Sequence, residues 1–573
     1  MTVARMFSET TASAEGVARV LRDTGIEFVF GMSGGYSDAL FKALAAHEDH
    51  IRTIVVRQES LAGIMAEVYG RLTRKPGVLL GQGPWVLGFG IPGILEARLS
   101  SSPMLILTDF SDQPYYALHG PYQTGMGNYG SWDAWQSFKG VSKEVLQARE
   151  PAEFVHGTQL AIKHALSGQP GPVTLIFTSK AAYGRVGPES QPALYPTQAY
   201  LPMSPPPADP ARVAEAASLL ATAKTPVIIA GNGIRLSNAY DALSEFAAVA
   251  QIPVVTSATG KGVIADTDPL ALGVYGNFGT PAANACVSEA DVVLVIGSKL
   301  SSGDTIGENP ALLDPRRQTF IQVDVEPRNA SWTFPVEHVL IGDAGTVLAQ
   351  LGEAIGATRG ETGIARVQAY RKEHGHFDSA NYLSDNDSIL PQRVVGELMR
   401  TLPEDAMITV DAGENRIFMT HWYKTRRAGH FLMAGGAGPM GYSIPAALAA
   451  KLVYPNRPAV AVCGDGGFAM TMNGLLTAVQ YDIPIIVVVL NNATLGWVRH
   501  GGGPAGSDLG EFDYSAIARG MGCEGIRVDD SRSLGEALRA GLASKRPVVI
   551  DVRTSMDQTF TSVESPLLAK VSG

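Results

Sequence analysis

The sequence predicts an α/β protein with three doubly wound parallel-sheet domains. Short apolar, β-branched runs alternate with helix-like stretches along nearly the whole chain, as in parallel sheets with crossover helices. Several of these runs stop at glycine and polar residues, the edge at which α/β sheets bind ligands. At 573 residues the chain is too long for one hydrophobic core and indicates three domains of ordinary size.

The composition fits a well-buried globular enzyme, with 45% apolar and 17% charged residues. A net charge of −10 argues against a nucleic-acid surface. The first residues carry no signal segment and no run of about 18 apolar residues occurs, so we expect a cytoplasmic protein outside the membrane. The widely spaced Cys286, Cys463 and Cys523 form no metal or redox motif and predict no disulfide.

Changes in composition divide the chain into domains and linkers. Residues 184–209 are rich in proline, glycine, serine and tyrosine, and residues 357–388 are charged and poorly periodic, so we interpret both as linkers. His374 and His376 lack further clustered ligands, and we interpret them as linker residues rather than a metal pair. The expected domains are residues 1–183, 210–356 and 389–556, followed by a tail, 557–573, that is either a lid or disordered.

The first domain begins with an expected helix over 14–21. The first expected strand runs into a glycine loop that ends at Gly35 and Tyr36, and the second ends at Glu59, before an alanine- and glycine-rich helix. The third runs into Gln82-Gly83-Pro84. These strands, and a fourth that closes the domain, are expected at 28–30, 54–56, 78–80 and 173–177.

The middle domain has the same alternation of strands and helices. The first strand is followed by Gly231-Asn232-Gly233, a weak nucleotide signal because it lacks the full G-x-G-x-x-G pattern. Its strands are expected at 226–230, 254–256, 292–296 and 320–324, after a helix at 210–222.

The last domain carries the motif around which the chain is organised. One apolar run stops at Gly464-Asp465-Gly466-Gly467, and a second stops at Asn491-Asn492, with Asn492 placed 27 positions after Asp465. We interpret the runs as parallel strands joined by a crossover helix, so both polar ends fall at one edge of the sheet. Glycines let a phosphate approach the backbone, and carboxylate and amide oxygens suit Mg²⁺.

This motif resembles the diphosphate-anchoring motif of thiamine diphosphate (ThDP) enzymes, and the chain is similar to the acetolactate synthase and pyruvate oxidase group over nearly its whole length. The resemblance implies that Mg²⁺ is held by the side chains of Asp465 and Asn492 and by the backbone carbonyl of Thr494. It also implies a cofactor-bending role for Met440, which follows a glycine loop. Cofactor contacts are implied for Glu414, Asn415, Gly438, Met440, Gly464, Asp465, Gly466, Gly467, Asn492, Thr494, Leu495 and Gly496.

Glu59 matches the family glutamate that hydrogen-bonds the aminopyrimidine ring of the cofactor. The cofactor's own imino nitrogen removes the C2 proton, and a buried carboxyl bonded to the opposite ring nitrogen favours that tautomer. Gln58 stands where histidine is frequent in the family. An acidic Glu414 beside phosphates would be unfavourable unless a metal or a proton offsets its charge.

Substrate contacts are expected from three places. The resemblance brings Gly35 and Tyr36 to the reacting end of the cofactor and turns Leu495 and Trp497 towards the substrate. The aromatic loop over 110–136 departs furthest from the family, and His119 and Gln123 in it could contact a carbonyl or a carboxylate; an equal alternative is that this loop packs at a subunit interface. Trp85, which follows Pro84, also departs from the family and suggests a substrate bulkier than pyruvate.

The resemblance implies a ThDP- and Mg²⁺-dependent enzyme that adds the C2 carbanion to a 2-keto acid or related carbonyl compound, with acetolactate synthase-like carboligation as the leading reaction. A non-decarboxylating C–C lyase, a 2-keto acid decarboxylase, a flavin-linked oxidase and a catalytically silent ThDP-fold subunit stay open. The resemblance also implies a homodimer or homotetramer whose active site lies between subunits. Whether the middle domain binds FAD or has only a structural role stays open as well.

Overall fold

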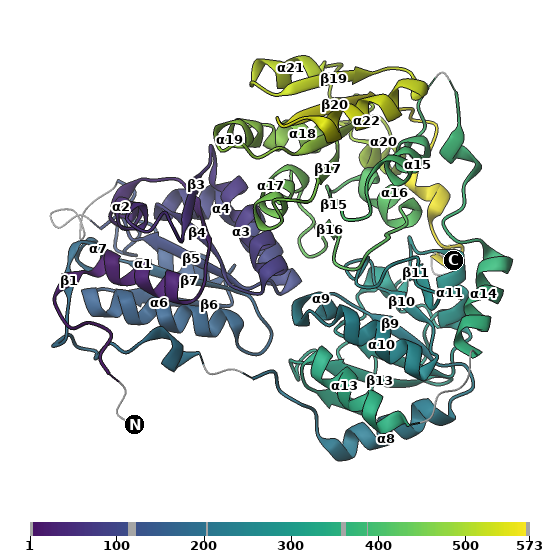
Figure 1. The fold of residues 1–573 in the computed structure, drawn as a ribbon, viewed down its shortest axis with the longest axis horizontal. Coiled ribbons are helices and arrows are strands. Elements are labelled where there is room, and N and C mark those ends of the chain that lie inside the picture. The colour runs from purple at the N-terminus through teal and green to yellow at the C-terminus, as the bar shows by residue number, and fades with distance from the viewer. Residues whose placement is uncertain (1–3, 113–121, 202–203, 357–361, 387, 569–573) are drawn as a thin grey trace. The chain divides into compact units, whose positions relative to one another are not determined.

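The computed structural model describes residues 4–112, 122–201, 204–356, 362–386 and 388–568. The chain forms two compact units. The first consists of Met1–Ser204, Leu448–Val453 and Thr471–Ile483, and the second of Pro205–Ala447, Tyr454–Met470 and Pro484–Gly573. The first unit holds one six-stranded parallel sheet and the second holds two (Figure 1). Three parallel sheets with helices between their strands confirm the predicted fold class.

The first sheet has the strand order β3-β2-β4-β5-β7-β6. Its central strands are buried on both faces, which is why they read as continuous apolar runs in the sequence. Helices α1 and α6 pack on one face, and α4 packs on the other, where Gly90 lies against Leu79 (Figure 1). The strands are β2 (Phe28–Gly31), β3 (Arg52–Val55), β4 (Gly77–Gly81), β5 (Met104–Asp109), β6 (Glu144–Ala148) and β7 (Pro172–Phe177). The other elements are β1 (Thr11–Ala12), α1 (Ser13–Asp23), η1 (Gly35–Ser37), α2 (Asp38–Ala45), α3 (Glu59–Thr73), α4 (Gly83–Ser100), α5 (Ala134–Lys139), α6 (Pro151–Leu166), α7 (Ser179–Tyr183), β8 (Arg185–Val186) and η2 (Thr197–Tyr200).

The middle sheet has the strand order β11-β10-β9-β12-β13-β14, with hydrophobic clusters on both of its faces. The strands are β9 (Val227–Ala230), β10 (Val254–Thr256), β11 (Ala271–Val274), β12 (Val292–Ile296), β13 (Thr319–Asp324) and β14 (His338–Ile341). The helices are α8 (Pro210–Thr222), α9 (Gly233–Ser237), α10 (Tyr240–Ala250), α11 (Pro281–Ser288), α12 (Ser302–Thr305), α13 (Ala344–Ile355) and α14 (Thr362–His374).

The last sheet has the strand order β16-β15-β17-β18-β20-β19. The strands are β15 (Met407–Val410), β16 (Phe431–Met433), β17 (Ala459–Gly464), β18 (Ile486–Asn491), β19 (Glu524–Val528) and β20 (Val548–Arg553). The remaining elements are η3 (Ala380–Leu383), α15 (Pro391–Thr401), α16 (Glu414–Trp422), α17 (Ser443–Val453), α18 (Asp465–Thr471), α19 (Gly474–Gln480), α20 (Gly496–Gly502), α21 (Tyr514–Gly520), η4 (Ser531–Ser533), α22 (Leu534–Ala543) and η5 (Phe560–Val563).

The first and last sheets share one topology. When strands are counted in chain order within each domain, both sheets have the order 2-1-3-4-6-5, whereas the middle sheet has the order 3-2-1-4-5-6. In each sheet the strands that follow the first strand are added on one side of it and then on the other. A ligand crevice is expected at the point where this change of side occurs. The candidate residues of the first and last domains therefore occupy matching edges of two similar sheets.

The segment expected as the second linker contains a helix, and the described part of the C-terminal tail is packed against the protein. Helix α14 occupies much of residues 357–388, which the sequence suggested were a linker, and packs against α11 through Val367. In the tail, Phe560 and Val563 join the core of the last domain. Further along, Ser565 N donates to Asn277 O at 2.7 Å, so the described tail contacts the middle domain as well.

Candidate active site

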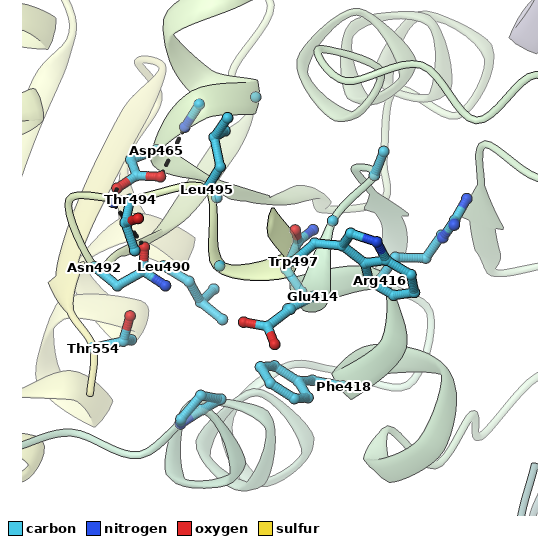
Figure 2. A pocket seen from close by; sticks show the side chains of 18 of the residues that line it. Glu414, Arg416, Phe418, Asp465, Leu490, Asn492, Thr494, Leu495, Trp497 and Thr554 are labelled. Carbon is cyan, nitrogen blue, oxygen red and sulfur yellow. Dashed lines mark hydrogen bonds between the residues drawn. The ribbon is translucent and has the colours of Figure 1, made fainter. Parts of the chain in front are cut away.

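A cavity of about 260 Å³ lies at the C-terminal ends of β15, β17 and β18 in the last domain (Figure 2). The parallel strands deliver their loops to this single edge, as the sequence predicted. Gly438 does not line the cavity. The predicted residues that line it are Glu414, Asn415, Met440, Gly464, Asp465, Gly466, Gly467, Asn492, Thr494, Leu495, Gly496 and Trp497.

Asp465, Asn492 and Thr494 converge on one side of this cavity (Figure 2). The Thr494 N–H lies 3.2 Å from Asp465 Oδ2 and 3.2 Å from Asn492 Oδ1, so the two side-chain oxygens meet at one amide. One carboxylate, one amide oxygen and one backbone carbonyl form a donor set that suits Mg²⁺ completed by phosphate oxygens. The residues present therefore fit a magnesium diphosphate.

Burial raises the pKa of Asp465 to about 6, although backbone N–H donors, including that of Gly466 at 2.8 Å, oppose the shift. A divalent cation beside the carboxylate would favour its charged form and reverse this shift. Among the described residues no group of three or more histidine, cysteine or carboxylate side chains is placed to hold a metal ion, so His374 and His376 belong to no such group.

Gly466 lies close to the side chains of Met440 and Leu495, which also line the cavity. A Cβ at position 466 would lie 2.8 Å from Met440 Cε and 2.9 Å from Leu495 Cδ2, closer than carbon atoms approach. A side chain at position 466 would therefore force Met440 and Leu495 to shift, in addition to narrowing the access of a phosphate to the backbone.

Asp411 is a site residue that the sequence did not single out. It follows β15 and is fully buried, and its carboxylate accepts hydrogen bonds from Gly441 N at 2.8 Å and from Ser443 N and Oγ at 3.0 Å each. These bonds fix the loop that carries Met440. Burial raises the pKa of Asp411 to about 6 despite them. The available signal was its position: a polar residue directly after an apolar strand.

Glu414 and Asn415 begin helix α16, and their side chains have partners within the protein. Asn415 Nδ2 donates to Asp411 O at 3.0 Å. Glu414 Oε1 accepts from His500 Nδ1 at 2.7 Å and from Phe560 N at 3.0 Å. Glu414 thus faces the cavity and also holds the C-terminal segment.

The C-terminal segment covers one side of the cavity, a role the sequence left undecided. The Phe560 ring stacks on Trp497 at a centroid distance of 4.2 Å and 14° between planes, and Phe278 of the middle domain meets Trp497 edge-on at 5.9 Å. Ser555 and Gln558 line the cavity. Trp497 therefore lies between the cavity and the tail, where its exposed face could meet a substrate.

Glu59 lies in the first unit, after β3, as the first residue of α3. Its side chain is buried, and this burial raises the pKa of the carboxyl, opposed by a hydrogen bond from its own backbone. A buried carboxyl whose pKa is raised binds its proton more readily, which fits the role that the resemblance implies.

Gly35, Tyr36 and Gln123 lie at the same edge of the first sheet as Glu59, and His119 falls outside the described residues. The Tyr36 N–H donates to Asp109 Oδ2 at 2.8 Å, and Gln82 Nε2 donates to Gln123 Oε1 at 2.8 Å. No strand was assigned from the sequence at the position of β5, and Asp109, the polar residue at the end of that strand, was therefore missed.

The glycines of Gly231-Asn232-Gly233 have a packing explanation. A Cβ at Gly231 would lie 2.3 Å from Gly297 O, and one at Gly233 would lie 2.5 Å from Gly297 Cα. The turn after β9 therefore needs glycine because the chain after β12 approaches it closely, with or without a nucleotide.

Comparison with known proteins identifies the family. The chain matches the family models for the thiamine pyrophosphate enzyme N-terminal TPP binding domain over residues 12–128, its central domain over 213–351 and its C-terminal TPP binding domain over 411–552. The chain belongs to this family and is a ThDP-dependent enzyme of the carboligase and decarboxylase class.

Within the family, the chain belongs to the acetolactate synthase and pyruvate oxidase-like group. It is 31% identical over 565 residues to a probable acetolactate synthase large subunit of Methanocaldococcus jannaschii, covering 94% of this chain and 91% of the relative. It is 30% identical to the acetolactate synthase large subunit of Haemophilus influenzae, covering 94% and 93%, and 29% identical to isozyme 3 of Escherichia coli, covering 95% of each. No described helix is long and apolar enough to cross a membrane.

Proposed function

We propose that the protein is a ThDP- and Mg²⁺-dependent carboligase that takes a 2-keto acid or related carbonyl compound as donor and joins its acyl unit to a second carbonyl compound. The observation that carries this proposal is the convergence of Asp465 and Asn492 on the Thr494 amide within a cavity of about 260 Å³. The similarity to acetolactate synthase large subunits favours carboligation over the other reactions of the class.

The residues of the last domain hold the cofactor. The side chains of Asp465 and Asn492 and the carbonyl of Thr494 bind Mg²⁺, and the glycine backbone around Gly466 admits the diphosphate. Met440 would support the bent form of the cofactor. Asp411 keeps Met440 in position, because its carboxylate holds the loop that carries this methionine. The hydrogen bond from His500 to Glu414 offsets part of the negative charge that would otherwise face the phosphates.

ThDP, when bound, supplies a carbanion that adds to the donor carbonyl and serves as the electron sink for C–C cleavage. Glu59 of the first domain holds a proton at the aminopyrimidine ring, and burial supports this role because it raises the pKa of the carboxyl. The stacked rings of Trp497 and Phe560 lie at one side of the cavity, where they help to keep water out of it.

The proposed assembly, which the family resemblance supports, is a homodimer or homotetramer in which a first domain faces a last domain of another subunit, in the cytoplasm. The middle domain is proposed to be structural, and the glycine packing at Gly231 supports this role. A yellow protein after purification would instead favour the flavin-linked alternative.

The test is turnover with added ThDP and Mg²⁺ on a panel of 2-keto acids, alone and with aldehyde acceptors, with CO₂ and products read by mass spectrometry. A hydroxyketone product establishes carboligation and names the donor. CO₂ without coupling would favour a decarboxylase, and cofactor binding without turnover of any donor would favour a non-decarboxylating lyase or a silent subunit. A Glu59→Gln variant is expected to lose at least about 100-fold in rate, and full activity would refute the role of Glu59.

A further inference from the structure

The loop that carries Met440 follows a short strand at the edge of the last sheet. Strand β16 has three residues, stands at one end of the strand order and pairs with β15. It leads directly into Ala434–Met440, which we call the cofactor loop. Three of the seven residues in this loop are glycines, so its own sequence does little to fix its conformation. The position of Met440 must therefore depend on residues that pack against β16 and the loop.

A segment of the middle domain, Thr259–Asp266, supplies such contacts, and we call it the supporting segment. Asp266 N donates to Thr425 O at 2.9 Å, and Asp266 Oδ2 accepts from Thr425 N and from Thr425 Oγ1 at 2.8 Å each. Gly429 N donates to Gly262 O at 2.8 Å. These bonds join the middle domain to the last domain just before β16 begins.

Lys261 extends this contact to β16 itself. Its Nζ atom lies 5.5 Å from the centroid of the Phe431 ring and 3.3 Å from Asp266 Oδ2, and the side chains of Lys261 and Asp266 are both buried. A buried ammonium is costly unless it is paired, so the carboxylate and the aromatic face hold the lysine in one place. The first residue of β16 therefore packs on a fixed part of the middle domain.

Thr259 reaches the cofactor loop at Gly435. A Cβ at Gly435 would lie 2.2 Å from Thr259 Cγ2 and 3.1 Å from Thr259 Cβ. Since the φ of Gly435 lies outside the left-handed region, the contact with Thr259, rather than the backbone conformation, disfavours a side chain there. The Thr259 hydroxyl is hydrogen-bonded to that of Ser257 at 3.2 Å, while the methyl group faces Gly435.

The turn that carries Thr259 is held by the middle domain. Ser257 N donates to Ala230 O at 3.1 Å, at the end of β9, and Ala258 N donates to Asp304 Oδ1 at 3.1 Å. These bonds tie the turn to the end of a buried strand and to α12. Thr259 therefore acts as a fixed point against which the cofactor loop rests.

The last domain holds the two ends of the cofactor loop by its own side chains. Arg416 Nη1 donates to Ala434 O at 3.0 Å, and Asp411 Oδ1 accepts from Gly441 N at 2.8 Å. Thr259 adds a contact between these two points. Because both ends are held, a displacement caused at this contact has to be taken up within the loop.

We propose that the middle domain positions the cofactor loop through the supporting segment, and that Thr259 is a positioning residue for Met440. The proposal rests on the function proposed above, in which Met440 supports the bent form of ThDP. It gives the middle domain a role that needs no bound nucleotide. A small displacement of a group that orients reacting atoms can lower a rate strongly, so a contact remote from the chemistry can matter.

The first test uses the protein without cofactor. Thr259→Ala is expected to raise the amide hydrogen exchange of residues 434–442, measured by mass spectrometry, at least about fivefold, because it removes the contact with Gly435. The matched control is Thr346→Ala, at a half-buried threonine of α13 whose hydroxyl is 3.2 Å from Asp343 Oδ1. Equal exchange of the loop in the two variants would overturn the proposal.

The second test moves one methyl group across the contact. In Gly435→Ala the new methyl group overlaps Thr259 Cγ2, and in Gly435→Ala combined with Thr259→Ser that atom is gone. The measured quantity is the rate at which bound ThDP exchanges its C2 proton with D₂O, followed by acid quench and NMR. Gly435→Ala is expected to be at least about tenfold slower than wild type, and the double variant to recover to within about threefold.

Two outcomes of the second test would overturn the proposal: exchange in Gly435→Ala that equals wild type, or a double variant as slow as Gly435→Ala. Titration calorimetry of ThDP separates positioning from general damage. The affinity of Gly435→Ala is expected to stay within about threefold of wild type, because the residues proposed to hold Mg²⁺ and the diphosphate are unchanged. A loss of affinity as large as the loss of exchange rate would show a merely structural contact and would also overturn the proposal.

Both tests can be decided separately from the proposed function. Amide exchange and C2 proton exchange need neither a donor nor an acceptor, so they report on Thr259 even if no 2-keto acid is consumed. Carboligation together with a double variant that does not recover would refute the positioning role alone.

Discussion

The carboxylate of Glu414 accepts a hydrogen bond from His500 Nδ1 at 2.7 Å, and the other ring nitrogen of His500 lies 3.1 Å from Met556 O. The imidazole therefore bridges the first turn of α16 and the start of the C-terminal segment. Phe560 N adds a second bond to the same Glu414 oxygen at 3.0 Å. One side chain of the cavity wall thus fastens the segment that covers the cavity.

Glu414→Ala is expected to release the C-terminal segment. The variant leaves the Phe560 N–H and the His500 ring without their acceptor, and losing hydrogen bonds to a buried charged group costs about 2–3 kcal/mol. Local opening should then rise at least about tenfold, and trypsin should cut after Arg553 correspondingly faster. Glu536→Ala, at an exposed position of α22, is the control. Equal cleavage rates for both variants would contradict the fastening role.

Asp465→Asn is expected to weaken Mg²⁺-dependent ThDP binding at least about 100-fold. The substitution keeps the size of the side chain but removes the only carboxylate of the proposed metal set. Titration calorimetry of ThDP at several Mg²⁺ concentrations measures the effect. Asp508→Asn tests charge alone, because Asp508 is exposed and pairs with Arg499 at 2.8 Å. If the Mg²⁺ requirement of Asp465→Asn is the same as that of wild type, Asp465 is not a ligand of the metal.

Gly466→Ala is expected to lower kcat about tenfold with less effect on cofactor affinity. The new methyl group would lie 2.8 Å from Met440 Cε and 2.9 Å from Leu495 Cδ2, so both side chains must shift. A shift of Met440 would change the bend of the cofactor. An increase of about 1.4 kcal/mol in the activation free energy lowers the rate tenfold. Gly502→Ala is the matched control, since a Cβ there meets nothing within 4 Å. Equal kcat values would show that Met440 adapts freely.

Local pattern was enough to predict several of the strands, although not β5, and the edge at which the site lies. The run at 292–296 has the bounds of β12, and the change from β17 to α18 falls between Gly464 and Asp465. Both predictions depend on neighbouring residues only: buried parallel strands are continuous apolar runs, and glycine and polar residues end them.

The partners of the site residues could not be predicted in this way. Asp411 meets Ser443 and Glu414 meets Phe560 across long separations in sequence, and nothing in the residues beside each of them records the meeting. Helix α14 was missed for a different reason. Of its described residues only Gly363 and Val367 are buried, so its sequence lacks the apolar stripe that predicts a helix.

His376 gives the protein a predictable dependence of stability on pH. Its Nε2 atom lies 3.1 Å from Asp266 O, and burial, with the nearby charge of Arg371, lowers its pKa from 6.5 to about 4. Between these values the unfolded chain binds the proton and the folded chain does not. The stabilisation is therefore complete above pH 6.5 and is lost as the pH falls towards 4. After allowance for partial exposure, it amounts to about 1–2 kcal/mol.

His376→Gln should remove this dependence, because glutamine stays neutral and its amide N–H can still reach Asp266 O. In urea unfolding at pH 7 and pH 5, wild type is expected to lose about 1–2 kcal/mol more than His376→Gln on acidification. His374→Gln, in the last turn of α14, should follow wild type. If His376→Gln and wild type lose the same free energy of unfolding between the two pH values, His376 is protonated as readily in the folded chain as in the unfolded one.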